Sequence, residues 1–213
     1  MRITVGLFAL AAICLLARPA AAQSRADDPD LALRGFAVVS EQAFAAQDSF
    51  EAAFGQSILP FYGGGLELVS RGYFLDIAAS RARKTGERAF IHNGETFHLG
   101  IPLTVTITPL EFTFGYRFFR SHRVVPYAGA GIGSYRYQET SQQSDAAEAV
   151  DTREAGYLAT GGAEFGVTRW FRVGIDVQYS YVPDILGEGG LSEAAGESDL
   201  GGLAARLKFV VGR

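Results

Sequence analysis

Residues 171–182 (FRVGIDVQYSYV) alternate between apolar and polar side chains along their whole length. Val173, Ile175 and Val177 fall on one face of an extended chain, and Arg172 and Asp176 fall on the other. Successive side chains of a β-strand point to opposite faces, so the pattern predicts a strand with one apolar and one polar face. The pattern alone leaves open which face meets water.

The same signal recurs along the chain and predicts an all-β protein. The expected strands are 34–45, 62–71, 73–84, 104–119, 124–140, 154–168, 171–183 and 199–211. A short turn of helix is expected at 48–54 (DSFEAAF). The apolar phase changes at Pro109, and because strand prolines are confined to edges and bulges, we expect a β-bulge there.

The links between the predicted strands alternate in length. Those at 70–72, 120–123 and 168–170 are short, and those at 46–61, 85–103, 141–153 and 184–198 are long. Outer-membrane barrels sort their links in this way, with short periplasmic turns, long external loops and an even number of strands. The sequence therefore predicts an eight-stranded antiparallel up-and-down transmembrane β-barrel in the bacterial outer membrane.

The beginning of the chain has the pattern of a secretory signal peptide. Residues 1–22 combine Arg2, an uncharged and mostly apolar run at 3–17, and three alanines at 20–22. A transmembrane anchor is the alternative, but the run is shorter than the ~20 residues that a spanning helix needs. We expect a short periplasmic segment at 23–33 and the barrel at 34–213. The only cysteine, Cys14, lies in the signal, so the mature protein has no thiol chemistry.

The polar phase of the strands places charged side chains inside the barrel. An eight-stranded barrel is just wide enough for its own side chains, so we expect these charges to form a structural network that fills the interior. The predicted members are Glu67, Asp76, Glu111, Arg117, Arg136, Glu164, Arg172, Asp176, Arg206 and Lys208.

Aromatic residues near the strand ends fall in the apolar phase. Rings with a polar tip favour the boundary between hydrocarbon and headgroups, so two aromatic belts are expected on a lipid-facing surface. The predicted members are Tyr62, Tyr73, Tyr116, Tyr127, Tyr135, Tyr137, Tyr157, Trp170, Tyr179 and Tyr181. A soluble lipocalin-like barrel is the alternative, but it offers no interface for these belts.

Other constellations predict little chemistry. The glycines at 129–133 are spaced GxGxG rather than GxGxxG, so no dinucleotide loop is expected. His92 and His98, with Glu87 and Glu95, lack the defined spacing of a metal site. A lipid-modifying enzyme would need a histidine to activate a serine of the loop that holds Ser141, Ser144, Asp145 and Glu148, and the strands supply none. His122 lies among arginines in a short turn. We expect no catalytic residue, cofactor or metal.

The chain resembles the small outer-membrane β-barrel proteins of Gram-negative bacteria, the OmpA-like and OmpX/OmpW-like group. The resemblance lies in 125–137 (VPYAGAGIGSYRY), 112–119 (FTFGYRFF) and the final amphipathic strand, 203–211. It implies contact with outer-membrane lipid, with lipopolysaccharide and with the outer-membrane assembly machinery.

Two functions remain open from the sequence. The first is an envelope structural or surface-interaction role through the long external loops, and the alternative is a narrow channel for small solutes or hydrophobic molecules. A lipid-modifying enzyme is a third possibility. The net charge of −4 argues against a nucleic-acid partner, and the sequence names no external partner.

Overall fold

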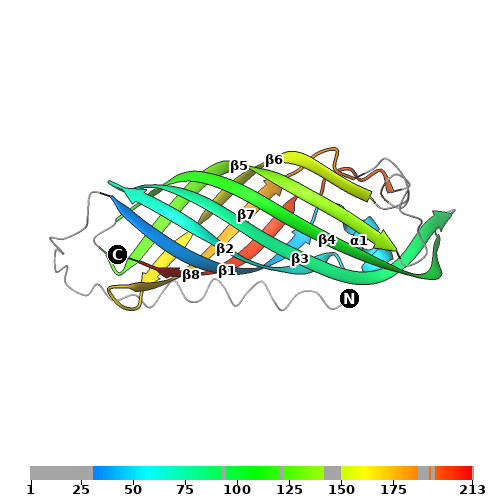
Figure 1. Ribbon diagram of the computed structural model, residues 1–213, viewed down its shortest axis with the longest axis horizontal. Helices are drawn as coiled ribbons and strands as arrows, with labels where there is room; N and C mark the ends of the chain where they lie inside the picture. The colour runs from blue at the N-terminus through cyan, green and yellow to red at the C-terminus, as the bar shows by residue number, and fades with distance from the viewer. Residues whose placement is uncertain are drawn as a thin grey trace.

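The computed structural model describes residues 31–92, 95–119, 122–141, 150–186, 192 and 195–212. Eight antiparallel strands form one closed barrel (Figure 1), in which each strand pairs with the next and the last pairs with the first. The strands are β1 (Ala32–Phe44), β2 (Ile58–Ser70), β3 (Tyr73–His92), β4 (Glu95–Arg117), β5 (Val124–Ser141), β6 (Val150–Gly166), β7 (Phe171–Tyr181) and β8 (Gly202–Val211). The predicted eight-stranded up-and-down barrel is confirmed. The predicted signal peptide at 1–22, and most of the segment that follows it, lie outside the described residues.

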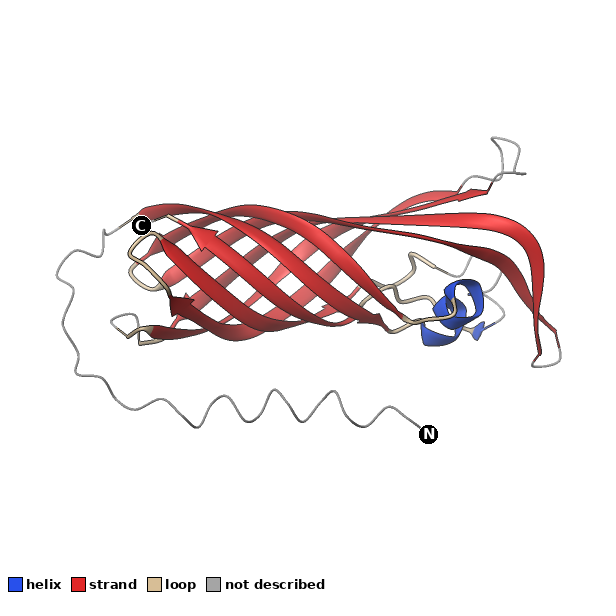
Figure 2. Ribbon diagram, turned by 90° about the horizontal axis from the view of Figure 1, so that it is seen from below, coloured by secondary structure: helices blue, strands red, loops and turns tan. Residues whose placement is uncertain are grey.

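The two ends of the barrel differ. At one end, β2 and β3 join through a two-residue turn in which Arg71 and Gly72 have φ angles of 50° and 95°. Two successive positive φ angles give a turn whose twist matches that of the flanking strands. The other end carries the helix α1 (Gln47–Phe54), where a helical turn was predicted, and a long projecting hairpin (Figure 2). No helix among the described residues has the length and apolar character to cross a membrane.

The projecting hairpin corrects the prediction of a loop at 85–103. In the structure β3 and β4 continue through this segment and pair from Thr85 opposite Thr104 to His92 opposite Glu95, with a register shift between Glu87 and Ala89. The two strands pair with each other along one edge, and the outer edge of each strand keeps backbone groups that point away from the pair. Within the described residues, the pairing of β4 with β5 ends at Leu103 opposite Ser141, and the hairpin projects beyond the other strands (Figure 2).

The predicted bulge at Pro109 is wrong. The register of β4 against β5 is continuous from Leu103 to Arg117, and the odd-numbered side chains face the interior throughout. Val105 and Ile107 are buried inside the barrel just as Glu111 is. The apolar phase changes because the interior itself changes from polar to apolar along the strand, while the strand keeps its orientation.

We call the barrel end that carries α1 and the hairpin the external end, after the orientation expected for an outer-membrane barrel, and the opposite end the short-turn end. The interior of the external half is an apolar core. The rings of Phe44 and Phe50 stack with their centroids 4.1 Å apart, which holds α1 over the end of the barrel. The core consists of Phe44, Ala46, Phe50, Leu59, Phe61, Ala82, Val105, Ile107, Tyr135, Tyr137, Val182, Ile185 and Leu200. The core lies at the barrel end that carries the hairpin.

Candidate functional site

A network of ion pairs occupies the interior between the short-turn end and the middle of the barrel. Glu164 on β6 is its centre, because it accepts hydrogen bonds from Arg117 at 3.0 and 2.5 Å and from Arg172 at 2.9 Å. Arg34 on β1 reaches Glu164 at 3.4 Å and also binds Glu67 on β2. Five side chains from five strands, β1, β2, β4, β6 and β7, are thereby joined across the barrel axis.

Further pairs continue the network toward the middle of the barrel. Lys208 binds Asp76 at 2.6 Å, and Arg206 binds Asp176 at 2.5 Å. The five carboxylates, Glu67, Asp76, Glu111, Glu164 and Asp176, are all buried. Five cations face them: Arg34, Arg117, Arg172, Arg206 and Lys208. Buried charges of balanced sign stabilise one another only as long as each keeps its partner.

Little space is left between these side chains. A cavity of about 30 Å³ lies beside Asp76, Glu111, Gln178, Arg206 and Lys208. One water molecule needs ~10–15 Å³ of such cavity volume, so the cavity has room for about two. The geometry therefore offers room for solvent at single sites beside the network.

The structure places nine of the ten predicted network residues inside the barrel and one outside. The nine are Glu67, Asp76, Glu111, Arg117, Glu164, Arg172, Asp176, Arg206 and Lys208. Arg136 is the exception, because its side chain is 41% exposed on the outer face and pairs with Asp151 of β6 at 2.5 Å. Arg34 was missed, although it begins the first predicted strand.

Three of the predicted interface tyrosines are also corrected. Tyr127, Tyr135 and Tyr137 point into the barrel and are buried. Their hydroxyls donate to buried or half-buried carboxylates: Tyr127 to Asp176 at 2.5 Å, Tyr135 to Glu111 at 2.7 Å and Tyr137 to Glu139 at 2.5 Å. A carboxylate inside a barrel needs donors, and these phenols supply them.

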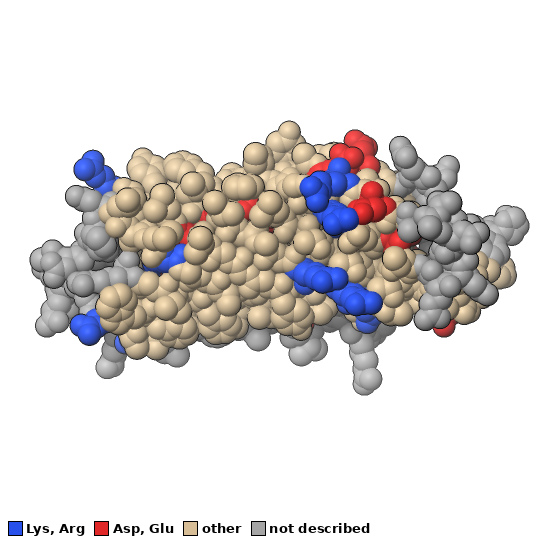
Figure 3. Space-filling view, in the orientation of Figure 1, with Lys and Arg blue, Asp and Glu red and all other residues tan. Residues whose placement is uncertain are grey.

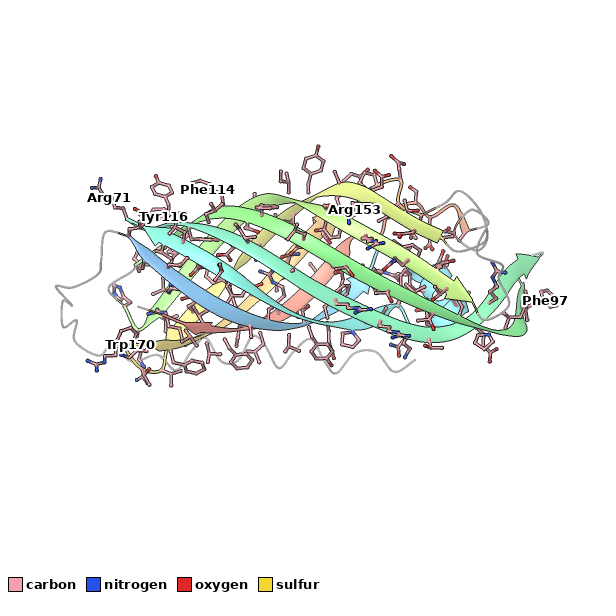
Figure 4. The ribbon with its side chains drawn as sticks, viewed as in Figure 1. Arg71, Phe97, Phe114, Tyr116, Arg153 and Trp170 are labelled. Atoms are coloured by element: carbon pink, nitrogen blue, oxygen red, sulfur yellow. The ribbon has the colours of Figure 1, made fainter. Side chains whose placement is uncertain are left out.

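The other predicted interface aromatics lie on the outer face. They are exposed side chains, namely Tyr62, Tyr73, Tyr116, Tyr157, Trp170, Tyr179 and Tyr181. Tyr116 and Trp170 lie at the short-turn end of the barrel (Figure 4). Between the ends, the outer face of the strands carries exposed apolar side chains such as Leu66, Ile77 and Phe112.

One carboxylate, Glu197, links two segments at the external end. Glu197, which lies in the segment before β8, accepts hydrogen bonds from the backbone amides of Asp48 and Ser49 at 3.1 and 2.9 Å and from the Ser49 hydroxyl at 2.6 Å. A carboxylate at the first turn of a helix satisfies amides that have no partner within the helix. It therefore ties α1 to the segment between β7 and β8.

The remaining predicted candidates form no site in the described part of the chain. The glycines at 129–133 lie within β5. The backbones of His92 and His98 lie in the projecting hairpin, and their side chains, like those of Glu95 and Ser141, lie outside what the structure describes. Ser144, Asp145 and Glu148 also lie outside the described residues. His122 Nδ1 contacts the Phe119 carbonyl at 3.2 Å within its turn. No group of three potential metal ligands occurs among the described residues.

Comparison with known proteins decides the family. Residues 8–200 match the family model described as outer membrane protein beta-barrel domain. The chain belongs to this family. Membership in the outer membrane β-barrel family places the protein in the bacterial outer membrane, so the exposed apolar side chains of its outer face meet lipid. No protein of curated function matches the sequence significantly.

Solved structures show the same fold in other outer-membrane barrels. Neisserial surface protein A is 11% identical, with 86% of this chain and 96% of that chain covered and a TM-score of 0.52. The barrel domain of Pseudomonas aeruginosa OprF is 12% identical, with 85% and 97% covered and a TM-score of 0.44. Ail of Yersinia pestis, solved with a heparin analogue, is 10% identical, with 85% and 97% covered and a TM-score of 0.49. At 11% identity and a TM-score of 0.52, the likeness to Neisserial surface protein A shows the fold alone.

Proposed function

We propose that this outer-membrane barrel is a surface-interaction protein that acts through its external end, and that the β3–β4 hairpin is its main contact element. The observation that carries the proposal is the extension of this hairpin beyond the barrel wall (Figure 2). Within the described residues, β5 does not pair with residues 95–102 and β2 does not pair with residues 85–92. A two-stranded ribbon of this kind presents free backbone edges to a partner.

Apolar side chains on the hairpin support the same role. The exposed fraction is 41% for Phe97 and 50% for Leu99. Phe97 lies at the far end of the molecule, opposite the end that holds Tyr116 and Trp170 (Figure 4). Apolar side chains that face water at a protein tip are typical of contact sites for other molecules.

The filled interior supports this role over the alternative of a channel. The charge network joins strands across the barrel axis, and the apolar core lies above it toward the external end. An ion on the barrel axis would have to separate the buried pairs around Glu164 and then cross the apolar core. Both steps cost free energy, because a charge without a partner is unfavourable in a low-dielectric interior. We propose that the interior is a closed structural element.

Bacterial adhesion tests the surface role. A strain without the protein is complemented with the full chain, with F97S/L99S, or with Gln56→Ser, a control in the exposed link after α1. Binding is measured to an apolar polystyrene surface and to a layer of the same bacteria. We expect the wild type and the control to raise adhesion and F97S/L99S to return it to the background. Equal adhesion by all three variants would contradict a role for the hairpin, and increased detergent sensitivity without adhesion would indicate a purely structural function.

A further inference from the structure

Four arginines lie on the outer face of one side of the barrel, near its external end. Arg81 and Arg83 come from β3, Arg136 from β5 and Arg153 from β6, and all four belong to the outward phase of their strands. We call them the arginine belt. Lys and Arg side chains gather on this face in two neighbouring groups toward the external end (Figure 3), and Figure 4 places Arg153 in the upper group.

The belt begins where the apolar outer face ends. Along β3 the outward side chains run from Tyr73 through Leu75 and Ile77 to Arg81. Arg81 lies eight positions after Tyr73 on β3. That offset is ~27 Å along a strand, and ~20 Å along the barrel axis for a strand tilted by ~40°. The apolar band of such barrels is ~25 Å tall, so the long arginine side chains reach the level of the outer-leaflet headgroups.

Strand pairing sets the belt residues side by side with hydroxyl and amide groups. In one row Arg83 lies opposite Thr106, Thr106 opposite Gln138, and Gln138 opposite Asp151. In the neighbouring row Thr108 lies opposite Arg136, and Arg136 opposite Arg153. Adjacent strands are ~4.8 Å apart, so the four strands offer a surface of polar side chains ~14 Å wide, in which all but Asp151 carry hydrogen-bond donors.

The charge of this surface is unbalanced. Asp151 neutralises Arg136 through two hydrogen bonds of 2.8 and 2.5 Å. Arg81 and Arg83 form no ion pair with any carboxylate in the described part of the chain. Arg153 lies directly opposite Arg136, and like charges in that position destabilise a sheet. The belt therefore carries a surplus of positive charge that an external anion would balance.

Among the described residues, the opposite side of the barrel has no such surface. At the same end, the outward side chains of β7, β8 and β2 include Tyr179, Leu203 and Tyr62, all exposed. The one charged outward side chain of β1 at this end is acidic, Glu41. The positive charge is thus confined to one side, and general attraction of the whole rim to an anionic surface does not account for it.

We propose that the arginine belt binds the phosphate groups of the phosphorylated glycolipid of the outer leaflet, lipid A. Guanidinium groups form paired hydrogen bonds with phosphate oxygens, and the hydroxyls of Thr106 and Thr108 add donors between them. Lipid A supplies its phosphates at the level of the belt and its acyl chains along the apolar band below. Charge complementarity and position in the membrane select the same occupant. This site is separate from the hairpin surface and does not depend on its function.

Binding of purified lipid A to the refolded full chain in neutral detergent micelles tests the proposal. Native mass spectrometry or fluorescence titration is carried out on the wild type, on R81Q/R83Q/R153Q, and on the matched control R71Q/R123Q/R169Q at the short-turn end. Each arginine beside an anionic surface contributes about fivefold, so we expect the belt variant to bind roughly a hundredfold more weakly. The control should bind as the wild type does. Heat-modified electrophoretic mobility verifies that every variant is folded.

Three results would overturn the proposal. Equal affinity of the belt variant and the wild type would show that the arginines make no contact with the glycolipid. Equal affinity for lipid A stripped of its phosphates would assign the binding to acyl chains alone. Full displacement of lipid A by inorganic phosphate at the same concentration would identify a site for the free ion, and the lipid source would be wrong.

Discussion

At the scale of single residues, the interior network determines which side chains the barrel tolerates. Glu164 serves Arg34, Arg117 and Arg172, and its side chain is 1% exposed. Its replacement by glutamine leaves two buried cations and the half-buried Arg172 with one negative charge fewer among them. Removing one partner of a buried pair costs about 3–5 kcal/mol. We expect Glu164→Gln to lower the free energy of unfolding by that amount, measured by denaturant unfolding in detergent micelles.

Asp151 is the matched control for Glu164, because it also pairs with an arginine but lies on the exposed outer face. Solvent and salt screen such a pair, so Asp151→Asn should leave the unfolding midpoint nearly unchanged. A large loss of stability for both variants would contradict the distinction between the interior network and the outer face.

Tyr127 tests the corrected orientation of β5. Its hydroxyl donates to the buried Asp176 at 2.5 Å. Tyr127→Phe leaves this carboxylate with one donor fewer, so we expect a loss of about 1–3 kcal/mol in the free energy of unfolding. Tyr179→Phe removes a hydroxyl from the outer face and should cost much less. Denaturant unfolding of the two variants compares them directly, and equal losses would place Tyr127 on the outer face after all.

At the scale of elements, most strands could be predicted from the sequence and one could not be oriented. In β7 and β8 the apolar and polar residues alternate, so the apolar residues identify the outer face and the polar residues the interior face. In β5 the stretch at 129–133 consists of glycine, alanine and isoleucine, and both faces are small and apolar. The tyrosines then decided the phase by analogy with an aromatic belt, and the analogy was wrong. The correct phase could have been found from Glu111 and Asp176, because two carboxylates predicted inside the barrel need hydrogen-bond donors that inward-facing tyrosines supply.

The faces of β4 were predicted wrongly for a related reason. If its apolar side chains faced outward along the whole strand, β4 would need a bulge at Pro109. Val105 and Ile107 instead face an apolar interior, because the barrel is filled at its external end by residues of α1 and its neighbouring links. A period-two pattern identifies two faces but carries no information about what packs against each.

The β3–β4 hairpin is expected to be independent of barrel stability. Its outer part pairs only with itself in the described residues, while its base at Gly86 approaches the Ala53 carbonyl of α1 too closely for any side chain. We therefore expect replacement of 88–101 by an Asn-Gly turn to preserve the denaturant midpoint and the heat-modified mobility. A barrel that fails to refold after this change would show that the hairpin is a structural element of the wall.

Helix α1 depends on Glu197. Glu197→Ala removes two backbone hydrogen bonds and one hydroxyl hydrogen bond at the helix start. Loss of a helix cap costs about 0.5–2 kcal/mol, so we expect faster amide exchange at 48–50 with an unchanged exchange rate in the strands. The measurement is hydrogen exchange on the detergent-solubilised protein. Exchange that stays slow throughout would assign the anchoring of α1 to the stacked Phe44 and Phe50 rings alone.

At the scale of the whole molecule, the barrel reverses its polarity along its axis. Within the membrane the outer face is apolar and the interior is charged, whereas toward the external end arginines lie outside and an apolar core lies inside. The reversal follows the surroundings, because hydrocarbon covers the lower outer face and headgroups and water cover the upper one. This arrangement is the basis for our proposal that the interior is closed and that the protein acts at the cell surface.

Single-channel recording of the refolded full chain in a planar bilayer tests this closure most directly. With the ion-paired network around Glu164 and the apolar core both intact, we expect the bilayer current to stay at its baseline over the range of applied voltage. Steady, reproducible conductance steps from the folded wild-type protein would mean that ions traverse the centre of the barrel, and the account of a sealed surface protein would be contradicted.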